Sequence, residues 1–346
     1  MDSRYRQARR VMVREWDPRT ASPAEIESML DMVNAVWAAD VPNDPQWQNS
    51  YLREYFSEVM PGERRLSWVA EEQTGDGRFL GHLGILLLGD IGVVELLVRP
   101  EARRHGIGRR LLADAAHRAY GEGFSSLGVE VVGDTPAAAF YEALGFQCAY
   151  IETRSVLRLD TVDWLALGEM ARGIGAGYRV EYHPGGPPEE LIEAYAVAKA
   201  EVHDPNDGDL DLRPSSYDPQ RLRESLACLH RRGMKPYIVL AIQEQTGQVA
   251  GLTEVVVPAQ RPTRADQYDT IVVPNHRGYG IDRAMKSRML FELRSAEPAL
   301  TEVQTWNAPD NEAMLKVNAE LGFEPDREWR EYEADVPELV RRLGQP

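Results

Sequence analysis

Apolar positions along the chain alternate between helical stripes and short continuous runs. Residues 26–37 and 189–202 have helical periodicity, and residues 93–98 (VVELLV) form a short apolar run typical of a buried strand. The segment after this run places an apolar stripe on one helical face and then stops at glycines. The stripe consists of Leu111, Leu112, Ala115, Ala116 and Ala119. Further strands are expected at 127–132 and 300–306, each followed by a helix.

The same order of elements occurs twice. Four landmarks recur at a spacing of about 170 residues, which indicates duplication of a whole domain rather than a short-period repeat. The matching pairs are 71–88 with 242–257, each with the signature of a β-hairpin, 95–108 with 269–282, 134–146 with 310–323 and, more faintly, 34–45 with 198–209. We expect an N-terminal domain at 1–160, a glycine-containing linker at 161–178 and a C-terminal domain at 179–346.

A glycine loop joins the apolar run of the first copy to the next helix, in the sequence RPEARRHGIGRRLL. Gly106 and Gly108 lie where the helix begins, with Arg103, Arg104, Arg109 and Arg110 around them. Unpaired N–H groups at a helix start attract anions, and glycines let a phosphate approach the backbone. The pattern therefore favours a phosphorylated ligand, although glycines at a helix start can also serve close packing alone. It matches neither the dinucleotide-binding nor the P-loop pattern.

Composition narrows the possible functions. The 346 residues carry a formal net charge of −16, which argues against nucleic-acid binding because that needs a basic face. The acidity suits a cationic substrate, or it only keeps the protein in solution. The two cysteines offer no zinc-site spacing. No membrane span and no secretory signal are recognisable, so we expect a cytoplasmic protein.

The glycine loop, followed at the right distance by AAAFYEALGF, resembles the acetyl-CoA motif and C-terminal helix of GNAT acetyltransferases. Because both parts occur twice, the chain resembles tandem GNAT proteins, a group that includes mycothiol synthase. The resemblance implies an α/β (α+β) fold with two tandem GNAT-like domains. Each domain would be a mixed, mostly antiparallel sheet flanked by helices, with a splayed central strand pair.

The resemblance also implies which residues bind acetyl-CoA or another acyl-CoA. In the first copy they are Leu96, Leu97, Val98, Arg103, Arg104, His105, Gly106, Ile107, Gly108 and Arg109. In the second copy they are Ile271, Val272, Arg277, Gly278, Gly280 and Asn311. The pyrophosphate would lie on the loop and the pantetheine arm along the strand edge. No metal is implied.

Three groups of the first copy are candidates for the chemistry. Glu95, a carboxylate in an apolar strand, is the candidate base, or else it faces solvent or pairs in a salt bridge. By resemblance, Tyr141 would protonate the leaving thiolate and the N–H of Leu97 would stabilise the oxyanion. Tyr141 can also be a packed core residue. Asp134 stands where the family often has Asn, so the pantetheine contact at that position is open.

The second copy departs from the motif at two positions. Asp269 matches Glu95 as a third candidate catalytic residue, but Asp282 replaces Gly108 and Asn318 replaces Tyr141. The loop that begins at His203 (HDPNDGDLD) is either a solvated loop or a binder of a cationic acceptor. Two arrangements remain open: the first copy catalyses, or the first holds cofactor while the second catalyses.

The predicted function is transfer of an acetyl or other acyl group from the coenzyme to a primary amine of a small molecule. Two alternatives are a non-catalytic acyl-CoA-binding tandem module and a protein N-acetyltransferase. The sequence indicates neither the acceptor nor the oligomeric state.

Overall fold

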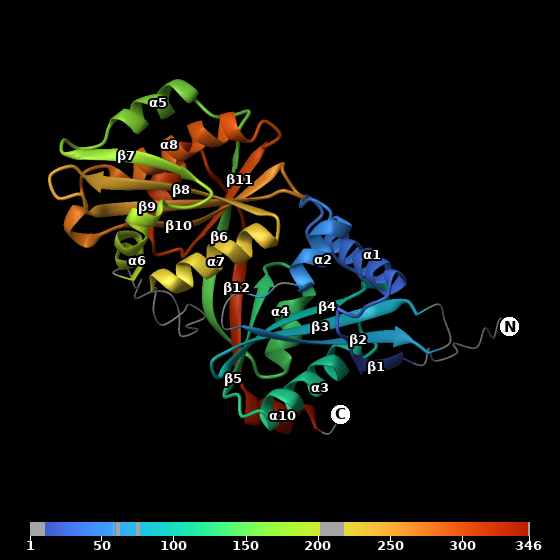
Figure 1. The fold of residues 1–346 in the computed structure, drawn as a ribbon. Coiled ribbons are helices and arrows are strands. Elements are labelled where there is room, and N and C mark those ends of the chain that lie inside the picture. The colour runs from blue at the N-terminus through green and yellow to red at the C-terminus, as the bar shows by residue number, and fades with distance from the viewer. Residues whose placement is uncertain (1–10, 58, 60–62, 74–76, 201–217, 345–346) are drawn as a thin grey trace. The chain divides into compact units, whose positions relative to one another are not determined.

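The computed structural model describes residues 11–57, 59, 63–73, 77–200 and 218–344. It divides into two compact units, drawn in Figure 1: residues 1–148 with 331–346, and residues 149–330. The loop that begins at His203 lies outside the described residues. None of the described helices combines the length and the apolar content needed to cross a bilayer.

The first unit contains a mixed, mostly antiparallel sheet in the order β1-β2-β3-β4-β5-β12, to which β12 contributes its part from residue 331 on. The bounds are β1 (Val11–Glu15), β2 (Arg64–Glu72), β3 (Phe79–Leu88), β4 (Ile91–Val98), β5 (Ser126–Val132) and β12 (Glu324–Asp335). Strands β1 to β4 pair antiparallel, whereas β4 and β5 pair parallel. The hairpin expected within 71–88 is thus the turn between β2 and β3.

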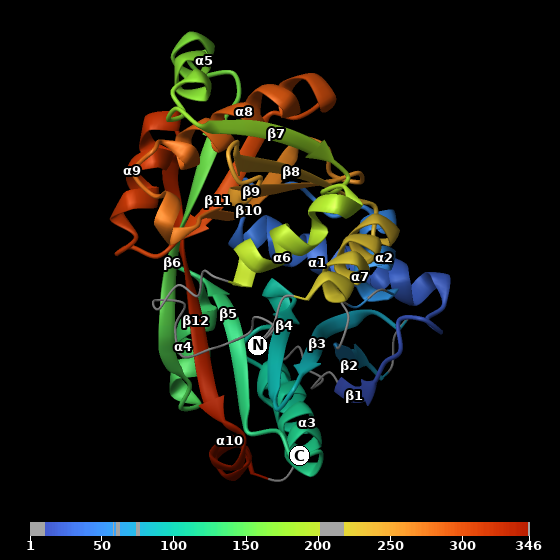
Figure 2. The same ribbon diagram turned by 60° about the vertical axis from the view of Figure 1, so that its left-hand side comes forward.

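Helices cover both faces of this sheet. Helices α1 (Pro23–Asp40) and α2 (Asn49–Ser57) pack on one face, and α3 (Ile107–Gly121), α4 (Pro136–Ala143) and α10 (Val336–Leu343) on the other. The expected helices at 26–37 and 108–123 are confirmed as α1 and α3. A capping box of Ser22 and Glu25 starts α1. Figures 1 and 2 both draw α10 beside α3.

The second unit repeats this plan in the order β6-β11-β10-β9-β8-β7. Its strands are β6 (Gln147–Arg158), β7 (Tyr178–Pro184), β8 (Met234–Gln243), β9 (Val249–Pro258), β10 (Arg264–Val272) and β11 (Glu302–Asn307). Helices α6 (Ile192–Ala200) and α7 (Pro219–Arg231) cover one face. Helices α5 (Trp164–Arg172), α8 (Ile281–Ala296) and α9 (Glu312–Leu321) cover the other.

The compact units do not follow the boundaries expected from the repeat. Residues 331–346 belong to the first unit because Tyr332, Val336 and Leu339 lie in its apolar core. Half of the segment expected as a linker, 161–178, is helix α5, whose Leu167 lies in the core of the second unit. Each unit thus takes a strand and a helix that follow the other repeat along the chain.

The expected splay of a central strand pair is present in both units. Pairing of β4 with β5 runs only from Ile91 to Val94, although β4 continues to Val98. Pairing of β10 with β11 runs only from Arg264 to Asp266, although β10 continues to Val272. The splay exposes backbone groups of β4 and β10 that the neighbouring strand leaves unpaired.

Candidate active site

A cavity of about 350 Å³ lies at the splay of the first unit. Strand residues Leu96 to Val98 form one side of it, and residues of α4, including Phe140 and Tyr141, also line it. The glycine loop and the end of α1 complete the lining with Ala102, Arg103, Arg104, Gly106, Ile107, Gly108, Arg109, Val36 and Asp40. The structure therefore brings nine of the ten cofactor-binding residues predicted in the first copy around one space. The tenth, His105, is exposed, and its Nδ1 lies 2.7 Å from the Arg103 carbonyl oxygen.

The backbone of this loop is shaped for an anion. Gly106 caps α3 in the left-handed region at φ 81°, and nothing lies within 4 Å of where its Cβ would be. The bond from Arg110 N–H to Gly106 O opens the helix, so the N–H groups of residues 107–109 precede the helical ladder. Such groups carry partial positive charge and suit a phosphate.

Most cations of the loop are already paired. Arg103 makes a two-pronged ion pair with Asp40, at 2.7 and 2.8 Å. Arg109 donates to the carbonyls of residues 342 and 343 at the end of α10, and Arg110 donates to Val11 O. Within the described chain, Arg104 is the exposed arginine of the loop that makes no such contact. It is therefore the arginine side chain most available to an anionic ligand.

Tyr141 lies on α4 at 3% exposure, between the rings of Phe140 and Phe146. Its hydroxyl is buried without a hydrogen-bond partner among the described residues. Burial raises the pKa of Tyr141 well above its ordinary value, so the phenol stays protonated at neutral pH. A buried hydroxyl without a partner is costly, and here it belongs to a residue that lines the cavity.

Glu95 does not line this cavity. Its carboxylate pairs with Arg65 at 3.0 Å and accepts a hydrogen bond from the Tyr55 hydroxyl. Its side chain is 35% exposed, whereas that of Arg65 is 8% exposed. The salt-bridge alternative for Glu95 is therefore realised, whereas its role as a base stays a prediction; the residue directly precedes the strand residues that line the cavity.

The direction of the backbone N–H groups changes the expectation for Leu97. Arg99 N–H donates to Leu80 O of β3, and N–H directions alternate along a strand. The N–H of Leu97 thus points toward β3, away from the splay. The N–H groups of Leu96 and Val98 point to the open side, so these two are the better oxyanion donors.

The second unit has the same loop with a different surface. Gly278 and Gly280 are left-handed at φ 86° and 67°, and Arg277 donates from Nε to Val272 O at 3.4 Å. A Cβ at Gly280 would lie 3.2 Å from the carbonyl oxygen of Gly173. Ile271 is buried in an apolar cluster. The chain's own backbone thus lies against Gly280, whereas the matching Gly106 of the first loop is open.

The other candidates of the second unit are engaged in internal pairs. Asp269 lies 3.1 Å from Lys199 Nζ, which also contacts both oxygens of the buried Glu254 at 2.8 and 2.9 Å. Burial and the nearby Asp269 raise the pKa of Glu254 well above its ordinary value. Asn311 accepts from Met314 N–H as the N-cap of α9.

Asn318, in the slot of Tyr141, accepts a hydrogen bond from Lys286 Nζ at 2.6 Å. Lys286 is 1% exposed, and burial lowers its pKa to about 7. Asn318 in turn donates to Asn307 at 2.7 Å. A buried ammonium and two amides therefore fill the place that a phenol holds in the first unit.

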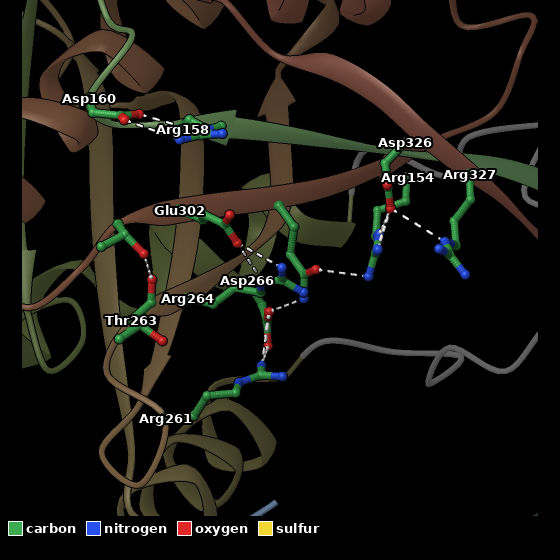
Figure 3. Close-up of polar contacts among 12 residues, drawn as sticks. Arg154, Arg158, Asp160, Arg261, Thr263, Arg264, Asp266, Glu302, Asp326 and Arg327 are labelled. Carbon is green, nitrogen blue, oxygen red and sulfur yellow. Dashed lines mark hydrogen bonds and ion pairs between the residues drawn. The ribbon is translucent and has the colours of Figure 1, made fainter. Parts of the chain in front are cut away.

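A polar network lies where β10 and β11 separate, as Figure 3 shows. Gln304 donates to Asp266 at 2.6 Å and faces Arg154, which is 2% exposed and pairs with Asp326. Burial raises the pKa of Asp266 against the opposing charge of Arg261. Because these charged groups satisfy one another inside the sheet, we interpret the network as structural.

Sequence reasoning missed five side chains that shape these sites: Arg65, Asp40, Lys199, Glu254 and Lys286. None of them lies in the glycine loop or in the motif of α4. The sequence held one signal for Glu254. When the two hairpins are aligned, Glu254 of the second copy matches Gly84 of the first. Across the described residues, no group of three or more His, Cys, Asp and Glu side chains is arranged to hold a metal.

Comparison with known proteins agrees with this geometry. Residues 28–146 match the Acetyltransferase (GNAT) family. A mycothiol acetyltransferase of Thermobifida fusca is 27% identical over 325 residues, which cover 88% of this chain and 93% of the relative. One from Rothia mucilaginosa is 26% identical over 255 residues, 68% of each chain.

Solved structures extend the match to the whole chain. A tandem GNAT protein from the clavulanic acid biosynthesis pathway superposes with a TM-score of 0.79 at 27% identity, covering 94% of this chain and 99% of that one. A GCN5-related N-acetyltransferase from Sphaerobacter thermophilus has the same fold, with a TM-score of 0.69, 15% identity and coverage of 94% and 96%. The expected fold class is therefore confirmed. Residues 28–146 thus match the GNAT family, and nearly the whole chain is similar to a tandem GNAT protein and to mycothiol acetyltransferases.

Proposed function

We propose that the first unit transfers an acetyl group from acetyl-CoA to the primary amine of a small molecule. One observation carries the proposal: the glycine loop, the splayed end of β4 and the buried Tyr141 hydroxyl border a single cavity. The glycine loop and Tyr141 lie apart in the sequence, and the fold brings them together. A thioester-activated acetyl group needs both an anion site for its carrier and a proton for its sulfur.

The residues present fit that coenzyme. The open backbone at Gly106, the helix-start N–H groups and Arg104 would hold the pyrophosphate. The backbone of Leu96 and Val98 would pair with the pantetheine amides, because β5 leaves it unpaired. When bound, acetyl-CoA supplies an acetyl group activated as a thioester.

Two side chains would move protons. The Glu95 carboxylate takes a proton from the acceptor's ammonium, directly or through water, which frees the nitrogen lone pair to form the new C–N bond. Tyr141 Oη would give a proton to the sulfur as the C–S bond breaks, and the second proton of the attacking nitrogen would return to Tyr141 as the amide forms. The raised pKa of Tyr141 keeps that proton in place beforehand. Of the N–H groups of Leu96 and Val98, the one that is not bonded to pantetheine would stabilise the negative charge on oxygen.

Three features of the second unit favour the first as the catalytic one. Asn318 has no proton to give near neutral pH and is bonded to Lys286. Asp269 is paired with Lys199. Gly280 is covered by Gly173. In this proposal the second unit has a supporting role, and Asp269 takes no part in acetyl transfer.

The test is release of free thiol from acetyl-CoA by the full chain, with and without a panel of primary amines. We expect release only with amine, and a loss of roughly 10²- to 10⁴-fold in kcat for Tyr141→Phe and for Glu95→Gln. Tyr120→Phe, at a 55% exposed site on α3, is the matched control. Tight coenzyme binding without amine-dependent release would instead indicate a binding module, and release with peptides alone a protein acetyltransferase.

A further inference from the structure

The ion pair of Glu95 and Arg65 lies beside the residues proposed to hold the thioester. Glu95 directly precedes the cavity-lining residues Leu96 to Val98 on β4. Arg65 lies on β2, two strands away from β4 in the sheet, and its Nη1 lies 3.0 Å from the Glu95 carboxylate. An acceptor amine at Glu95 would therefore also lie close to a guanidinium.

Arg65 is held in a fixed position. The Tyr55 ring lies 4.6 Å and the Phe56 ring 5.5 Å from its Cζ atom. Aromatic faces attract a guanidinium and limit its rotamers, so the fork is preorganised. The Tyr55 hydroxyl also donates to Glu95, so both charges are oriented by the same aromatic residue.

Glycine keeps the space between these groups open. A Cβ at Gly84 would lie 3.3 Å from His82 Cε1, 3.6 Å from Arg65 Nη1 and 3.7 Å from Glu95 Oε2. Any larger side chain at residue 84 would enter the cluster. The second unit has Glu254 at the matching position, where a buried carboxylate and Lys199 occupy the corresponding place.

Room for a ligand adjoins Arg65. A cavity of about 600 Å³ is lined by Arg65, Ser67 and Phe56 and by the charged residues Glu15, Asp17, Arg19, Glu63 and Arg64, whereas Glu95 is not among its lining residues. His82 adds no charge to this region, since burial and the charge of Arg65 lower its pKa to about 3. Its Nε2 is engaged with Ser67 Oγ at 2.6 Å. The polar groups around Gly84 thus present one cation and one anion.

We propose that the amine acceptor of the first unit is zwitterionic, carrying a carboxylate next to its amine as an α-amino acid does. Its ammonium would pair with Glu95 and its carboxylate with the Arg65 fork, so the internal ion pair is exchanged for two pairs with the acceptor. The planar guanidinium matches a carboxylate through two parallel hydrogen bonds. An amine without a carboxylate would compete with Arg65 for Glu95. It would offer the buried guanidinium no carboxylate in exchange. This inference rests on the proposed acetyl transfer.

The first experiment compares phenylalanine, phenylalaninamide and phenethylamine as acceptors for the wild-type chain, and likewise alanine, alaninamide and ethylamine. We expect kcat/KM for each amino acid to exceed that of its amide and its decarboxylated amine by roughly 30-fold or more. Calorimetric binding of the same compounds without acetyl-CoA should rank them in the same order. Equal kcat/KM and equal affinity across each set would overturn the inference.

The second experiment replaces the guanidinium. Arg65→Met should remove this preference: kcat/KM for the amino acids should fall by roughly 30-fold or more relative to kcat/KM for the decarboxylated amines. Arg78→Met, which removes the exposed pair with Glu101, is the matched control. Circular dichroism melting checks the fold of each variant, and the wild-type comparison does not depend on any variant. Equal turnover of amines with and without a carboxylate would contradict this inference alone. Absence of thiol release with any amine would contradict the proposed function itself.

Discussion

The loop that begins α3 and the loop that begins α8 have the same backbone and different surroundings. Both follow a proline-started 3-10 turn, and both cap their helix with a left-handed glycine. Gly106 is open, whereas Gly280 faces the carbonyl oxygen of Gly173. The first turn of the helix holds Gly108 in one unit and Asp282 in the other. A duplicated motif can thus keep its shape while only one copy keeps a surface that suits an anion.

The same contrast extends along the central strands. The first unit leaves space at Gly84 and, at Tyr141, a buried hydroxyl with no hydrogen-bond partner among the described residues. The second unit fills the matching places with Glu254, held by Lys199, and with Asn318, held by Lys286. Side chains that pair internally occupy the second unit at the positions where the first is open to a ligand.

Filling the first loop should have the largest effect. In Gly108→Val, the Cβ would sit at ordinary contact distances of 3.5 and 3.6 Å from Phe140 and Leu96, so the added methyl groups would enter the cavity. We expect wild-type chain to bind one acetyl-CoA, and this variant to bind it roughly 10³-fold more weakly, about 4 kcal/mol. Isothermal titration calorimetry measures both the stoichiometry and the affinity.

Asp282→Val is the matched change in the second loop and should alter the affinity by less than about threefold. Two bound coenzymes per chain, or an equal loss in both variants, would show that the loops do not differ as described.

The next effect concerns the apolar cores. Leu339 of α10 is 1% exposed in the first unit, and Leu167 of α5 is 2% exposed in the second. Leu→Ala at either position should cost about 3 kcal/mol of unfolding free energy. Hydrogen exchange should then accelerate in α3 for Leu339→Ala and in α8 for Leu167→Ala. Faster exchange in α8 for Leu339→Ala, with α3 unchanged, would contradict the assignment of residues 331–346 to the first unit.

Local pattern predicted much of this molecule. The helices α1, α3, α4 and α9, the two hairpins and the two glycine loops follow from apolar periodicity and from the positions of glycine. The exchange of the last strand and helix did not follow, because the apolar stripe of α10 can pack against any complementary face. Tertiary packing decides which core contains Leu339, and a sequence repeat gives no information on tertiary packing.

The candidate site was predicted where it is local and missed where it is not. The loop residues Arg103 to Arg109 are contiguous, so their shared role is visible in sequence. The partners Asp40 and Arg65 come from α1 and β2, and only the fold brings them to the loop and to Glu95. The direction of the Leu97 N–H depends on strand register, which apolar alternation alone does not give.

A smaller effect concerns the pH dependence of stability, to which the buried Lys286 of the second unit should contribute. Lys286 has its pKa lowered to about 7, so the unfolded chain binds more protons than the folded chain between about pH 7 and pH 10.5. Burial of the charged lysine lowers the free energy of unfolding, and this free energy therefore rises as pH rises through that window. Relative to Lys286→Met, the wild type should gain about 1 kcal/mol of unfolding free energy between about pH 6 and pH 8. Urea denaturation at both pH values measures the difference, and parallel curves would contradict a depressed pKa.

The smallest effect concerns how the first loop's charge is compensated. Asp40 holds Arg103 by two contacts and lines the cavity, whereas the matching Arg277 is exposed and donates to Val272 O. Asp40→Asn removes a negative charge near the expected pyrophosphate and keeps the shape of the side chain. Affinity for acetyl-CoA should rise about threefold at about 50 mM salt, and the gain should shrink at about 300 mM salt because screening weakens it. The pair is partly exposed, so stability should fall by less than about 1 kcal/mol. Weaker binding by Asp40→Asn would mean that the carboxylate acts mainly by orienting Arg103, and that orientation outweighs repulsion at this loop.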